Sequence, residues 1–84
     1  SDNVHEVAMV RRMYLNRQQT LDRFHSRGEM DINVLRTLAI KAFQDEHSYV
    51  QQQAAAGVIS SDLANALNEH ISNDQLVCIQ SFED

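Results

Sequence analysis

The stretches Gly28-Glu29-Met30-Asp31 and Gly57-Val58-Ile59-Ser60 decide how this chain folds. Each consists of a glycine, a variable residue, an apolar residue and a residue whose side chain caps helices. Glycine commonly ends one helix and aspartate or serine commonly begins the next, because both types of residue satisfy the free backbone groups at helix ends. The two stretches therefore predict two helix boundaries and four cap residues: Gly28, Asp31, Gly57 and Ser60.

Before the first boundary, apolar residues recur at the spacing of an α-helix. They form two rows with a spacing of seven residues, and one position in the second row is an arginine. The rows are Val7, Tyr14 and Leu21, and Val10, Arg17 and Phe24. This pattern predicts one helix over about residues 3–27. We expect both rows to belong to an interaction stripe.

The stretch between the two boundaries has a broad apolar side, which predicts a second helix over about residues 31–56. This helix is expected to add five residues to the interaction stripe: Leu35, Leu38, Phe43, Glu46 and Tyr49. A third helix is predicted over residues 60–72. Ser72-Asn73-Asp74 then indicates a turn or a new cap, and residues 73–84 are expected to form a short helix or a frayed end.

The sequence thus predicts an all-α fold in a single domain over residues 1–84, with three helices, or four if residues 73–84 form one. Proline is absent and glycine occurs twice, which disfavours a sheet with many turns. We expect the helices to pack as an antiparallel helical-hairpin bundle. A chain of this length buries a thin core, so contacts with a partner would add to its stability.

Charge is divided unevenly along the chain. All seven Lys and Arg residues lie before position 42, whereas residues 45–84 carry seven acidic residues and no basic one. The acidic half would repel phosphates, so we expect no nucleic-acid partner. Either the two halves attract each other, within one chain or across a dimer, or each helix is simply solvated.

Arg17 and Glu46 occupy equivalent positions in the stripes of the first two helices, 29 residues apart. The two glycine-led stretches are separated by the same number of residues, which suggests a weak internal repeat. Two arrangements of this arginine and this glutamate fit the pattern. They form an interior or interface ion pair that fixes the alignment of the helices, or both side chains extend to water at the edge of the stripe.

The sequence contains no pattern typical of a catalytic or cofactor site. The four histidines lack metal-ligand spacing, and both glycines follow predicted helices rather than strands. Ser60-Ser61-Asp62 is interpreted as a helix start, and Cys78, within an apolar run, as a buried inert thiol. We expect no enzyme activity, no metal, no cofactor and no small-molecule substrate. A single cysteine and the lack of a membrane-spanning apolar run predict a cytoplasmic location.

Residues 17–38 resemble a known family. Arg27-Gly28-Glu29-Met30-Asp31 followed by Val34-Leu35-Arg36-Thr37-Leu38 is similar to a motif in the cytoplasmic C-terminal tails of bacterial sodium/proton antiporters of the monovalent cation/proton antiporter family. The resemblance covers 22 of the 84 residues. The transport residues of that family lie in membrane helices, so no ion-binding residue is carried over to this chain.

The resemblance implies a regulatory or dimerisation domain at the cytoplasmic face of the inner membrane. Its interaction stripe would pair with a second copy, and the membrane portion of the same protein would be a further partner. The alternative is a free-standing helical adaptor or regulator, which would bind another protein through the same exposed stripe.

Overall fold

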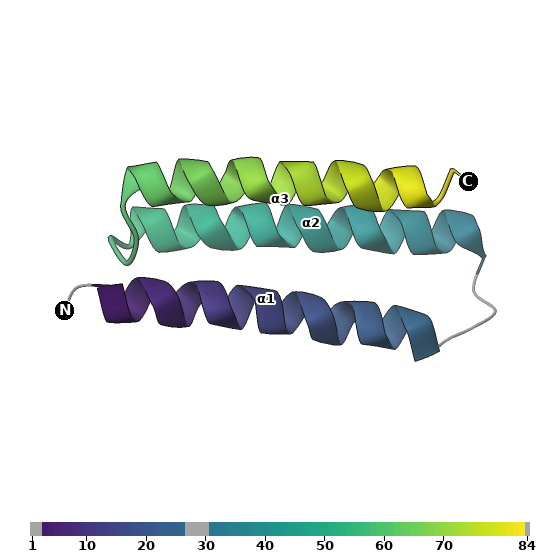
Figure 1. Cartoon of the computed structure of the whole chain (residues 1–84), viewed down its shortest axis with the longest axis horizontal. Coiled ribbons are helices and arrows are strands. Elements are labelled where there is room, and N and C mark those ends of the chain that lie inside the picture. Colours follow the sequence, from purple (N-terminus) through teal and green to yellow (C-terminus); the bar gives the residue numbers. More distant parts are fainter. Residues whose placement is uncertain (1–2, 27–30, 84) are drawn as a thin grey trace.

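The chain consists of three long helices. The computed structural model describes residues 3–26 and 31–83, which contain α1 (Asn3–Ser26), α2 (Ile32–Ala55) and α3 (Ser61–Ser81) and no strand (Figure 1). The prediction of an all-helical fold with three helices is confirmed.

The second and third helices begin at side-chain caps. The Asp31 carboxylate accepts a hydrogen bond of 2.7 Å from the backbone N–H of Asn33. The Ser60 hydroxyl accepts one of 3.1 Å from the backbone N–H of Leu63. Between these helices, Gly57 has a φ of +75°, a conformation that costs glycine little and ends α2. The predicted cap at Gly28 lies outside the described residues.

The predicted end of the third helix at residue 72 is wrong, as is the short fourth helix after it. α3 continues without a break through Ser72, Asn73 and Asp74 to Ser81. Neither glycine nor proline occurs after Gly57, so nothing in the backbone forces an end at this point. The carboxylate of Asp74, which suggested a new cap, instead accepts a hydrogen bond from the side chain of Arg17 on α1.

The helices lie side by side in a body of 46 × 20 × 17 Å. Figure 1 shows that α2 reverses the direction of α1 and that α3 reverses it again, so the two termini lie at opposite ends. α2 and α3 pack closely along their lengths, whereas α1 makes fewer contacts with α2 and leans away from it towards its own C-terminal end. α1 is therefore the most loosely held of the three helices.

The core is a single apolar cluster that extends along the α2–α3 pair and receives two residues from α1. Its fully buried side chains include Val50 and Ile71, each 0% exposed, and Met13, 2% exposed. The cluster comprises Met9, Met13, Phe43, Val50, Ile59, Ala64, Leu67 and Ile71. α1 thus contributes only methionines to the buried cluster among the described residues. Methionine is flexible, which suits it to packing between α1 and the α2–α3 pair.

Candidate functional site

Arg17 connects α1 to both other helices. Its Nε donates to Oε2 of Glu46 on α2 at 3.0 Å, and its Nη2 donates to Oε1 of the same carboxylate. Its Nη1 donates to Oδ2 of Asp74 on α3. The side chains of Arg17 and Glu46 are only 15% and 12% exposed, so this two-pronged contact is largely shielded from water. The three residues fix how far α1 is shifted along the other helices.

The guanidinium of Arg17 also lies over two aromatic rings. Its Cζ is 5.2 Å from the centroid of the Tyr14 ring and 5.3 Å from that of Phe43, within the range of cation–π attraction. The hydrogen bonds to Glu46 raise the pKa of Arg17, although burial opposes this, and Asp74 adds to the increase. Arg17 therefore carries its charge at every pH at which the fold exists.

Of the two arrangements that the sequence left open for Arg17 and Glu46, the structure contains the ion pair. The role of Asp74 was not predicted, because the Ser-Asn-Asp run that contains it was interpreted as a turn. The partners of Arg17 lie 29 and 57 residues along the chain. Sequence patterns relate residues that are close along the chain. The internal repeat of 29 residues pointed to Glu46, but nothing in the sequence pointed to Asp74.

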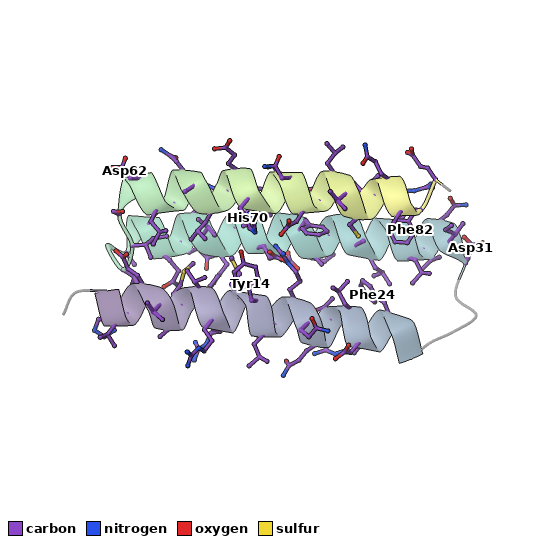
Figure 2. The ribbon with its side chains drawn as sticks, in the orientation of Figure 1. Tyr14, Phe24, Asp31, Asp62, His70 and Phe82 are labelled. Atoms are coloured by element: carbon purple, nitrogen blue, oxygen red, sulfur yellow. The ribbon has the colours of Figure 1, made fainter. Side chains whose placement is uncertain are left out.

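Tyr14 and His70 meet on the face that α1 and α3 share. Their rings lie edge to face with centroids 6.1 Å apart, and Nε2 of His70 lies 3.5 Å from Oδ2 of Asp74 (Figure 2). On the opposite side of α3, Nδ1 of His47 lies 2.9 Å from Oδ1 of Asn68. These two histidines therefore contact residues of α3, and no group of three potential metal ligands occurs within residues 3–26 and 31–83.

The structure divides the predicted stripe on α1 into an inner and an outer row. Val10, Arg17 and Phe24 are half-buried against the rest of the protein. The outer row is defined as Val7, Tyr14 and Leu21, which are 57%, 37% and 40% exposed. Three large side chains thus lie seven residues apart on the surface of one helix.

On α2 the predicted stripe is partly internal. Phe43 is only 5% exposed and belongs to the core, so its ring is not part of the surface of the single chain. Its ring packs within the core cluster, and the guanidinium of Arg17 lies over it. The other four residues are half-buried: Leu35, Leu38, Glu46 and Tyr49.

The stripe omitted Met9 and Met13, which are the residues of α1 that are most deeply buried. They lie one turn apart and precede Arg17 by eight and four residues, so the three share one side of the helix. Met9, Met13 and Arg17 follow one another at intervals of four residues, and this spacing could have identified the two methionines as buried.

A groove lies between the C-terminal half of α1 and the middle of α2. It has a volume of about 400 Å³ and is mostly apolar, and its lining includes Thr20, Leu21, Phe24, Leu38 and Ala42. Arg17 and Glu46 also contribute to the lining. The ribbon of α1 diverges from that of α2 towards the C-terminal end of α1 (Figure 1). Leu21 belongs both to this groove and to the outer row, so the two features are continuous.

Cys78 is half-buried in α3 and packs against the core. Burial raises the pKa of its thiol, and the nearby charge of Arg17 lowers it to a smaller extent. The thiolate, which is the reactive form, is therefore scarce at neutral pH.

We expect Cys78 to react several-fold more slowly with iodoacetamide in the folded protein than in denaturing urea, because both its raised pKa and its burial protect it. The reaction at about pH 8, near the ordinary pKa of a thiol, is followed by mass spectrometry of the intact protein. A free-cysteine peptide in the same two solvents corrects for the effect of urea on the reagent. Equal rates after this correction would show that the thiol is accessible.

Comparison with known proteins finds no family model, no curated protein and no solved structure that matches this chain. The likeness to antiporter tails therefore rests on residues 17–38 alone. None of the helices described here combines the length and the apolar character needed to cross a membrane.

Proposed function

We propose that this chain is a non-catalytic association domain, an antiparallel helical-hairpin bundle that forms a homodimer. The observation that carries the proposal is the outer row, in which Val7, Tyr14 and Leu21 are exposed at heptad spacing on a helix that buries a different side. Apolar residues at this spacing are the means by which helices pack against partner helices.

The weak attachment of α1 also supports association. α1 contributes two buried methionines and the Arg17 contacts to the fold, and Val7 and Leu21 of its outer row remain 57% and 40% exposed. A domain of 84 residues has little core with which to stabilise itself. Covering the outer row with another helix would remove apolar surface from water and hold α1 in place.

The biological setting that we propose is the cytoplasmic tail of a sodium/proton antiporter, on the strength of the similarity of residues 17–38. In that setting the domain would regulate the transporter or join its subunits, and it would lie beside the membrane portion of the same protein. No residue of this chain would take part in transport.

A free-standing adaptor is the second candidate, and the groove between α1 and α2 favours it. An opening of about 400 Å³ with Leu21, Phe24 and Leu38 in its wall is suited to apolar side chains from a partner's helix. In this case the partner would be a different protein, and the chain would be a monomer on its own.

We expect the wild-type protein to have twice its chain mass of 9.6 kDa in light scattering at high concentration. The double substitution Val7→Asp/Leu21→Asp should reduce the mass to that of one chain, because it places two charges in the apolar contact. The matched control is Ile32→Asp/Val34→Asp, which changes two apolar residues of similar exposure on α2 and should leave the dimer intact. A wild-type mass of one chain would contradict the dimer.

A further inference from the structure

The exposed charges around the outer row restrict what can cover it. Arg11 lies between Val7 and Tyr14 on α1, is exposed, and has no ion-pair partner among the described residues. If α1 packed in parallel and in register against α1 of a second copy, the two Arg11 side chains would lie near each other in the contact. Like charges placed opposite each other at an interface are unfavourable. The outer row therefore favours a helix with acidic residues.

The chain itself carries a helix of this kind. α3 has no basic residue, and its outer side combines exposed acidic residues with exposed apolar ones. Glu69 is exposed and has no ion-pair partner in the described part of the chain, and Leu76 and Val77 are 57% and 67% exposed. A second copy of the chain thus supplies both charge and apolar surface that complement α1.

The directions of α1 and α3 within one chain limit how two copies can pack. Tyr14 is level with His70, and Arg17 is level with Asp74, so α1 and α3 lie in a known register. α1 and α3 also run in the same direction (Figure 1). A two-fold axis perpendicular to the helices would therefore place α1 antiparallel to α3 of the second copy and would create two identical contacts.

We infer that α3 of a second copy covers Val7 and Tyr14 of the outer row, and that the unpaired charges set the alignment, with Arg11 opposite Glu69 of that copy. The same placement sets Val4 and Val7 opposite the turn that carries Leu76 and Val77, so apolar side chains meet at one end of each contact. Tyr14 then faces Ala66, whose small side chain leaves room for the ring. This inference rests on the proposed dimer and specifies which surfaces form it.

Charge exchange between the two helices tests this arrangement. Arg11→Glu and Glu69→Arg should each raise the dissociation constant of the dimer at least about tenfold, because each places like charges in both contacts. An equimolar mixture of the two variants should restore the wild-type affinity. In the mixed dimer one contact has the exchanged charges, the other has the natural ones, and both are attractive. Sedimentation equilibrium at low salt measures the dissociation constants of the wild type, the two variants and their mixture.

Arg12→Glu is the matched control, since Arg12 is an adjacent exposed arginine on a different side of α1 and should not change the dissociation constant. Circular dichroism should show unchanged helix content in every variant, because the substituted residues are exposed in the single chain.

Failure of the mixture to recover affinity, or an equal effect of Arg12→Glu, would overturn the α1–α3 arrangement. If Val7→Asp/Leu21→Asp still abolished the dimer, the proposed function would stand without this arrangement. A monomeric wild type would overturn both.

Discussion

Replacement of Arg17 by alanine is expected to lower the free energy of unfolding by about 3 kcal/mol. Removing one member of a buried ion pair typically costs about 3–5 kcal/mol, because the remaining charges lose their partner without regaining water. We expect the lower end of this range because the side chain of Asp74 is 33% exposed and can be solvated, whereas that of Glu46 is 12% exposed. Urea unfolding followed by circular dichroism measures the change.

Lys41→Ala is the matched control for Arg17→Ala. Lys41 pairs with Asp45 at 3.3 Å within α2, but both side chains are about two-thirds exposed (68% and 67%). Exposed pairs of this type contribute about 0–1 kcal/mol, so the control should be nearly neutral. Equal effects of the two substitutions would show that Arg17 does not hold α1 in place.

A double substitution separates the loss of charge pairing from the loss of packing. Arg17→Met/Glu46→Leu removes the buried charges together and keeps side chains of similar volume between α1 and α2. Replacing a buried ion pair by apolar residues is often neutral or stabilising, so we expect this variant to recover most of the stability that Arg17→Ala loses. If it were as unstable as Arg17→Ala, the packing of the arginine side chain over Tyr14 and Phe43 would be the main contribution.

The helices were predictable because their signals are local. Asp31 and Ser60 bond to backbone groups two and three residues away, and Gly57 adopts its positive φ without help from distant residues. The continuation of α3 was not predictable in this way. Ser72-Asn73-Asp74 has the composition of a helix start, and the residue that engages Asp74 within the helix lies 57 positions earlier.

The rotation of α1 was the part of the candidate site that the sequence left ambiguous. The row 7–14–21 and the row 10–17–24 both have helical spacing, so periodicity alone does not decide which one faces inward. The decision depends on Glu46 and Asp74, which draw Arg17 towards the other helices and turn its neighbours Met9 and Met13 inward with it. Val7, Tyr14 and Leu21 are left on the surface by the same rotation.

Replacement of Met13 by alanine tests this rotation directly and should cost about 2–5 kcal/mol. Met13 is 2% exposed and contacts the core, so truncation removes buried apolar atoms and leaves a cavity between α1 and the α2–α3 pair. Leu15→Ala, only two positions away in the same helix, should change the stability by less than about 0.5 kcal/mol because Leu15 is 56% exposed.

Comparing the stabilities of Met13→Ala and Leu15→Ala shows which side of α1 is buried. Alanine favours the helix in both variants, so the two substitutions differ mainly in the burial of the side chain that is removed. The comparison is made by urea unfolding at a concentration low enough to keep the protein monomeric, since a dimer contact would also stabilise α1. If Leu15→Ala were the more damaging substitution, α1 would bury the side that carries Leu15. The outer row would then not have the exposure on which its role in association depends.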